Sequence, residues 1–142
     1  MKLYNLRAGM NPRRVRIFLA EKGISIPLVD LDMDKGENRE AAFLAKNPLG
    51  TLPVLELDDG TLLAESIAIC RYFEELHPSP PLFGIDTLDR AKVEMWNRRM
   101  ELEIMLPLTQ AFIHGHPYWK GRVEKVPDYA KLARATALKR MA

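Results

Sequence analysis

The sequence predicts an α/β domain followed by a partial all-α domain. Three observations support this: residues 1–76 alternate short strand patterns with helical patterns, a proline-rich segment interrupts them at 77–84, and a long helical pattern follows. Alternating strands and helices are typical of an α/β fold, because each helix covers the sheet that its neighbouring strands build. The chain has 142 residues, enough for one domain and part of a second.

Turn and helix signals delimit the elements of the first domain. Asn11 is a good N-cap and Pro12 suits the first position of a helix, whereas Gly23 ends that helix. Asn47-Pro48 stops a less regular second helix, and Asp58-Asp59-Gly60 between apolar runs indicates a hairpin. The expected order is βαβαββα, the thioredoxin-like arrangement, with a right-handed first crossover. The predicted strands are 2–6, 28–31, 54–57 and 62–64, and the predicted helices are 11–23, 38–46 and 66–76.

A proline-rich linker separates the two predicted domains, because three prolines and a glycine between His77 and Gly84 break regular structure. Beyond it, Asp86 or Thr87 caps a long helix that carries apolar residues on two faces, so we expect packing partners on both sides. Pro107 is expected to kink this helix. Another helix is expected from about residue 127 to the end. The predicted parts are a thioredoxin-like domain at 1–77, a linker at 78–86 and a truncated all-α domain at 87–142; the two apolar faces are Ala91, Met95, Leu102 and Met105, and Trp96, Met100 and Ile104.

Composition and charge exclude several classes of protein. The net charge is +2, too small to indicate nucleic-acid binding, and the basic cluster Arg13, Arg14 and Arg16 is best interpreted as a solvated helix face with one turn aimed at an anion. The sequence has no run of about 18 apolar residues that would indicate a membrane span, and no signal-peptide core. Cys70 is the only cysteine, so an internal disulfide and a Cys-x-x-Cys pair are both excluded. We therefore expect a cytoplasmic protein without nucleic-acid or membrane partners.

The segment 47–66 combines three devices for binding a peptide. Leu52 precedes Pro53, and an X-Pro bond adopts the cis form at a cost of only about 0.5–1 kcal/mol. A cis bond there would turn the backbone amide and carbonyl of Leu52 outward, toward an extended peptide. Glu65 and Ser66 open a helix, whose free N–H groups favour a carboxylate, while Glu65 can pair with an ammonium group. An amine and a carboxylate on one carbon, followed by a peptide bond, describe a γ-glutamyl group.

In their order and spacing, these residues resemble the N-terminal domain of cytosolic glutathione transferases over most of residues 1–78. Met1-Lys2-Leu3-Tyr4 and the segment Arg13–Gly23 belong to the same resemblance. It implies a detoxifying, homodimeric transferase in which the thiolate of the cosubstrate glutathione attacks a small apolar electrophile, without a metal. The residues it assigns to glutathione are Leu52, Pro53, Glu65 and Ser66, with Lys35 for the glycyl carboxylate, and those it assigns to the electrophile pocket are Met105, Phe112 and His114.

Several of these residues also have an ordinary structural explanation. Lys35 is equally well described as an exposed loop lysine, Ser66 as an N-cap, and Phe112 as a core residue. His114 and His116 lie where the long helix ends, where histidines commonly interact with the helix dipole. A His-x-His pair without a third ligand nearby does not indicate a zinc site.

The loop after the first strand departs from the family pattern. The family commonly places a Tyr, Ser or Cys there to stabilise the thiolate, whereas this chain has Gly9 and Met10, as in a bacterial and fungal type of branch that lacks the usual donor. Asn11 and the start of its helix are the substitute, because an amide N–H and a helix N-terminus both favour an anion, and Arg13 and Arg14 add positive potential. The alternative is a non-catalytic glutathione-binding or interaction module of the same fold. The short helical part has two explanations, a fragment or a stunted domain, and the sequence does not decide between them.

Overall fold

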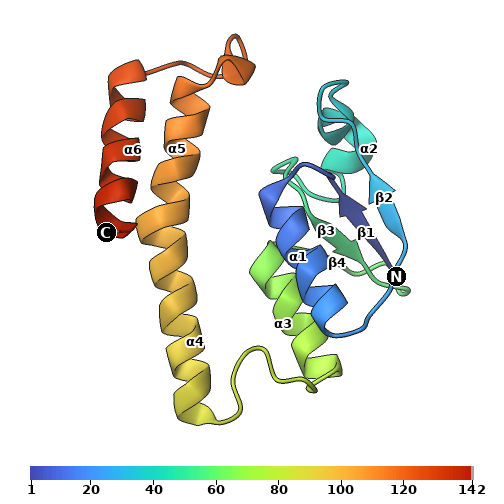
Figure 1. Cartoon of the computed structure of the whole chain (residues 1–142). Helices are drawn as coiled ribbons and strands as arrows, with labels where there is room; N and C mark the ends of the chain where they lie inside the picture. Colours follow the sequence, from blue (N-terminus) through green and yellow to red (C-terminus); the bar gives the residue numbers. More distant parts are fainter. Residues whose placement is uncertain (142) are drawn as a thin grey trace. The chain divides into compact units, whose positions relative to one another are not determined.

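The computed structural model describes residues 1–141, and the chain divides between Leu82 and Phe83 into two compact units (Figure 1). The boundary falls within residues 78–86, the range given above for the linker. The assignment of separate functional domains to the two units stays a prediction.

The first unit contains one four-stranded sheet in the order β2-β1-β3-β4. β1 pairs with β2 in parallel and with β3 antiparallel, and β3 and β4 form the predicted hairpin. This order confirms the thioredoxin-like fold expected from the sequence. The strands are β1 Lys2–Asn5, β2 Leu28–Asp30, β3 Val54–Glu56 and β4 Leu62–Ala64.

Helices cover both faces of this sheet. On one face, α1 (Met10–Glu21) and α3 (Ser66–Leu76) pack side by side (Figure 1), and the side chains buried in this unit include Val15 and Leu19 of α1 and Ile69 and Phe73 of α3. Successive side chains of a strand point to opposite faces of the sheet, and Tyr4 of β1 points to the face opposite α1 and α3. There it packs in a buried cluster with Phe43 of α2 (Ala41–Leu44), Leu52 and Val54. Burying each large apolar side chain contributes about 1.5–3 kcal/mol.

Two predicted helix boundaries in the first unit are wrong. The first helix begins at Met10 with Gly9 as its N-cap, because the Arg13 N–H already donates to the Gly9 carbonyl at 3.0 Å. Asn11 is therefore inside the helix and is not its N-cap. The helix predicted at 38–46 is divided into the 3₁₀ turn η1 (Glu37–Arg39) and α2, with Glu40 extended between them. The Asn38 amide donates to the Gly50 carbonyl at 2.7 Å, which holds η1 against the following loop.

The second unit begins with a long helical run. α4 (Thr87–Arg99), the π-helix η2 (Met100–Met105) and α5 (Leu106–Gly115) follow one another without a break (Figure 1). Asp86, one of the two predicted alternatives, caps α4 by accepting a hydrogen bond from the Asp89 N–H at 2.9 Å. Pro107 has no N–H and crowds the preceding turn. The six residues of the π-helix η2 end two residues before Pro107. The helix is therefore irregular where a kink was expected.

α6 (Pro127–Met141) packs against α5 after the short 3₁₀ turn η3 (Pro117–Trp119). The buried side chains of α6 are all alanines, Ala130, Ala133 and Ala137. A Cβ added to Gly115 would lie 3.4 Å from Ala130, so small residues allow the two helices to approach closely. Among residues 1–141, no helix is both long and apolar enough to cross a membrane.

Candidate functional site

The register of the sheet brings four predicted segments to one edge. β1 and β2 are parallel, so the first loop and the loop that carries Lys35 leave the sheet at the same edge. β3 is antiparallel to β1 and to β4, so the residues before β3 and those after β4 lie at that edge too. Continued by two residues, this register places Leu52 between Leu6 and Ser66. Segments far apart in the sequence therefore converge on one site.

Leu52 offers a free pair of backbone groups at this edge. Its bond to Pro53 is cis, as predicted. Within the described part of the chain, neither the N–H nor the C=O of Leu52 has a hydrogen-bond partner, although its side chain is buried. Backbone groups near a protein interior are normally paired. The free pair is thus suited to an extended peptide that binds as an added strand.

Glu65 and Ser66 open α3 as expected, but Ser66 is not the N-cap. That position belongs to Glu65, whose φ of 67° makes it the one non-glycine residue with positive φ between residues 1 and 141. Such a conformation costs about 1–3 kcal/mol and is frequent at ligand sites. The Glu65 carboxylate is exposed and makes no hydrogen bond or ion pair with the residues described here. The Ser66 side chain is buried and accepts a hydrogen bond from Arg14 at 2.6 Å.

The first loop has no side-chain hydroxyl or thiol at the start of α1. Gly9 has φ −72°, and the exposed side chain of the next residue, Met10, is apolar. The Asn11 amide oxygen accepts a hydrogen bond from Arg14 at 3.0 Å. The backbone N–H groups of Met10 and Asn11 have no backbone partner in the described chain, and Pro12 has no N–H. The positive end of α1 is therefore open toward the edge of the sheet.

Arg16, which was expected on a solvated basic helix face, instead fixes the path of this loop. Its guanidinium donates to the carbonyls of Leu6 at 3.2 Å and Arg7 at 2.8 Å, and to the side chain of buried Asn5. The Asn5 amide donates in turn to Asp30 of β2. A basic residue on the predicted helix face was visible in the sequence. Its partners were not, because they depend on how the strand and helix pack.

Lys35 lies in the loop after β2, with three quarters of its side chain exposed. Its ammonium group forms an ion pair with Asp32 at 3.2 Å, and this hydrogen bond raises the pKa of Lys35. Asp32 also accepts the backbone N–H groups of Asp34 and Lys35, and these bonds lower the pKa of its carboxyl group. An anionic ligand would therefore have to share Lys35 with a carboxylate.

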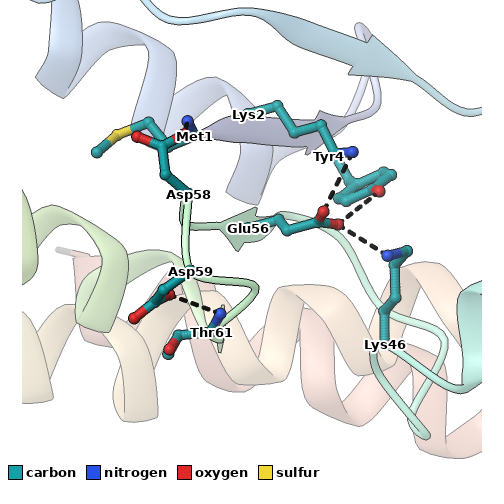
Figure 2. A network of polar contacts seen from close by, with 8 residues as sticks. All are labelled: Met1, Lys2, Tyr4, Lys46, Glu56, Asp58, Asp59 and Thr61. Carbon is teal, nitrogen blue, oxygen red and sulfur yellow. Dashed lines mark hydrogen bonds and ion pairs between the residues drawn. The ribbon is translucent and has the colours of Figure 1, made fainter.

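A polar cluster around Glu56, which the sequence did not indicate, stabilises the sheet at the end of β1 away from this site. Figure 2 shows the Glu56 carboxylate receiving hydrogen bonds from Lys46 and Tyr4, each at 2.8 Å, and an ion pair from Lys2 at 3.2 Å. The bonds from Lys46, Tyr4 and Lys2 lower the pKa of Glu56 to about 2. The cluster joins β1, β3 and the loop before β3, so its role is structural.

The chain's own thiol cannot replace that of glutathione. Cys70 is buried inside α3, and burial raises its pKa to about 12. Such a thiol stays protonated near neutral pH, and the thiolate is the nucleophilic form. Cys70 is therefore a small buried residue of the core.

The residues predicted for the electrophile pocket all belong to the second unit. Met105 ends η2 and is half-buried, whereas Phe112 is 44% exposed and lies against His116 with ring centroids 4.8 Å apart. The ring of His114 meets the edge of Tyr129 at 5.3 Å, and its buried Nδ1 has no hydrogen-bond partner in the part of the chain that the structure describes. Their assignment to an electrophile pocket stays a prediction. No group of three or more metal-ligating side chains occurs among residues 1–141.

Comparison with known proteins identifies the family. Residues 10–76 match the family model for the glutathione S-transferase N-terminal domain. The crystal structure of Gtt2 from Saccharomyces cerevisiae superposes with a TM-score of 0.91 at 41% identity, over 99% of this chain and 70% of that one. The chain belongs to the glutathione S-transferase family.

Two further relatives agree with this membership. A glutathione S-transferase domain-containing protein from Marinobacter aquaeolei VT8 has a TM-score of 0.90 at 37% identity, over 99% of this chain and 71% of that one. Glutathione S-transferase 2 of Saccharomyces cerevisiae is 46% identical over 126 residues, which are 87% of this chain and 54% of that protein. This family member spans about half the length of the curated relatives it matches.

Proposed function

We propose that this family member binds glutathione and transfers its thiolate to a small apolar electrophile. The observation that carries the proposal is the convergence at one sheet edge of three complementary groups. These are the free backbone pair of Leu52, the unpaired carboxylate of Glu65, and the open N-terminus of α1. They match the cysteinyl backbone, the γ-glutamyl ammonium and the thiolate of one tripeptide.

Binding in this mode would orient the thiol toward α1. Leu52 pairs with the cysteinyl residue as an added strand, and the start of α3 receives the γ-glutamyl group with its carboxylate at the helix N-terminus. Lys35 receives the glycyl carboxylate, in competition with Asp32. Glutathione is the cosubstrate and supplies the sulfur, so the protein contributes binding, orientation and charge stabilisation.

The N-terminus of α1 stabilises the thiolate. A free thiol has a pKa of about 8.5, and helix N-termini lower cysteine pKa values by one to several units. The unpaired N–H groups of Met10 and Asn11 supply the partial positive charge here. The sulfur then forms a bond to the electrophilic carbon, and the leaving group departs with the electron pair of the bond that breaks.

A second candidate function is a glutathione-binding module without catalysis. The specific observation in its favour is the first loop, where Gly9 and Met10 offer no hydroxyl or thiol. A Gly9→Ser variant is an imperfect repair, because a Cβ at that position would lie 3.0 Å from Cδ of Pro12 and 3.2 Å from a methyl of Leu6. Pro12 and Leu6 would have to shift before the serine side chain fits at this position.

One experiment distinguishes the two functions. Retention on glutathione resin, combined with turnover of a chlorinated aromatic substrate, supports the transferase. Retention without turnover supports the module, and failure of the wild-type protein to bind glutathione rejects both. The same proposal includes homodimerisation, a cytoplasmic location and a role in detoxification.

A further inference from the structure

Arg14 connects the starts of two helices that are far apart in the sequence. Its Nη1 atom lies 2.6 Å from Oγ of Ser66, at the start of α3, and 3.0 Å from Oδ1 of Asn11, at the start of α1. One guanidinium nitrogen carries two hydrogens, so it can serve both acceptors. Asn11 thereby anchors Arg14, and Arg14 reaches across to Ser66.

The chemistry of the guanidinium determines what Ser66 can do. Arginine only donates hydrogen bonds, whereas a hydroxyl both donates and accepts. Since Arg14 occupies an acceptor position of Ser66 Oγ, the hydroxyl hydrogen must point elsewhere. The Ser66 side chain is more than nine-tenths buried, and no acceptor for its O–H occurs within the described residues. Leaving a buried donor without an acceptor is unfavourable, so this hydroxyl is prepared for an acceptor that arrives with a ligand.

We propose that Arg14, anchored by Asn11, is a positioning residue that fixes the Ser66 hydroxyl as a hydrogen-bond donor to the γ-glutamyl carboxylate of glutathione. This inference rests on the proposed function. A hydrogen bond received by an O–H group also strengthens the bond that the group donates. Arg14 thus acts on the ligand through Ser66 rather than by touching it.

The neighbouring Arg13 separates positioning from charge. Arg13 is exposed, carries the same charge, and its side chain makes no hydrogen bond or ion pair with residues 1–141. Arg13→Met therefore measures the loss of one positive charge near the site. Arg14→Lys keeps the charge at the other position, but its nitrogen ends one bond short of Nη1, so the hydrogen bond to Ser66 is lost.

The experiment is a double-mutant cycle measured with two ligands. Binding is titrated by calorimetry for the wild type, Arg14→Met, Ser66→Ala and the double variant. One ligand is S-methylglutathione, which has no ionisable thiol, and the other is the same compound without the α-carboxylate of its γ-glutamyl group. Circular dichroism checks the fold of each variant. If Arg14→Met does not fold, Arg14→Lys takes its place in the cycle.

We expect Arg14→Met and Ser66→Ala each to weaken binding of S-methylglutathione about tenfold or more, because hydrogen bonds to charged groups have that effect. The double variant should bind no more than about twofold more weakly than Ser66→Ala alone, since both changes remove the same interaction. For the analogue without the carboxylate, Arg14→Met should have little effect. Arg13→Met should change either affinity less than about threefold.

Other results would overturn the inference. Losses that add in the double variant, or that are equal for both ligands, would show that Arg14 acts only through its charge or through the fold. A loss in Arg13→Met as large as that in Arg14→Met would lead to the same conclusion. If the wild type binds neither glutathione nor S-methylglutathione, the proposed function itself fails. Normal wild-type binding with additive losses rejects the role of Arg14 alone.

Discussion

The buried ion pair between Lys22 and Glu74 should dominate the stability of the first unit. The Lys22 ammonium is fully buried at the end of α1, 2.5 Å from the Glu74 carboxylate, which is 10% exposed. It also donates to the carbonyls of His77 at 2.7 Å and Pro80 at 2.5 Å. Glu74 accepts the Leu82 N–H at 2.9 Å. The pair therefore fixes the chain where it leaves α3.

Lys22→Met is the change that tests this role. It leaves the buried carboxylate and two carbonyls without their cation, and removing one partner of a buried pair costs about 3–5 kcal/mol. That is a large part of the 5–15 kcal/mol of free energy that typically stabilises a domain. Arg7→Met is the matched control, because Arg7 pairs with Asp30 at 3.1 Å in the same unit but is 88% exposed. Exposed pairs contribute about 0–1 kcal/mol.

The assay is urea unfolding followed by far-ultraviolet circular dichroism. Both tryptophans, Trp96 and Trp119, belong to the second unit, so tryptophan fluorescence follows that unit separately. Adding Glu74→Leu to Lys22→Met should restore at least about 1 kcal/mol, because it removes the stranded charge. A loss below about 1 kcal/mol in Lys22→Met, or no recovery in the double variant, would refute the reasoning.

Four further predictions concern the site, the pH dependence and association. Glu65→Gln should weaken glutathione binding about tenfold in calorimetry, because it removes a charged partner of the ammonium; affinity within twofold of the wild type would show that this group binds elsewhere. The Glu56 pKa of about 2 lies below the usual 4.5, so its stabilising contribution is complete above pH 4.5 and is lost as the pH falls toward 2. Glu56→Gln should therefore flatten the dependence of the unfolding midpoint on pH in that window, and an unchanged slope would contradict the assignment. Asn11→Asp should raise the pKa of the bound glutathione thiol through like-charge repulsion. This pKa is measured from the absorbance of the thiolate as a function of pH at saturating glutathione. A thiol that titrates like free glutathione in the wild type would reject activation by the helix. Trp96 is 54% exposed on α4, so sedimentation at tens of micromolar should show a dimer that Trp96→Lys weakens, whereas a wild-type monomer would contradict the proposal.

Local patterns predicted those elements whose signals lie within a few residues. The helix from Ser66 to Leu76 has the predicted bounds, because Glu65-Ser66 and His77-Pro78 mark its two ends. The cis Leu52-Pro53 bond and the start of α4 were also predicted, since each depends on adjacent residues. Local chemistry is enough where no distant contact competes with it.

Distant contacts explain what the sequence could not predict. Asn11 has the side chain of a good N-cap, yet the N-cap is Gly9, two residues earlier, where Arg16 holds the preceding carbonyls. The bond from Arg14 to Ser66 joins residues 52 positions apart, and the Glu56 cluster joins two strands and a loop. No periodicity in the sequence encodes such pairs, because they appear only when the sheet register is known.

The distinction between local signals and distant contacts also explains how this family member could act without a hydroxyl in the first loop. The groups that would recognise glutathione are held by tertiary contacts: Leu52 by its buried side chain and Ser66 by Arg14. The groups that would activate the thiol are backbone N–H groups at the start of α1, whose position depends on the loop that Arg16 fixes. A backbone donor needs no particular side chain at Gly9 or Met10. Activation of the thiol would therefore depend on the position of α1 more than on a hydroxyl in the first loop. The structure places the start of this helix at the edge where Leu52 and Ser66 converge.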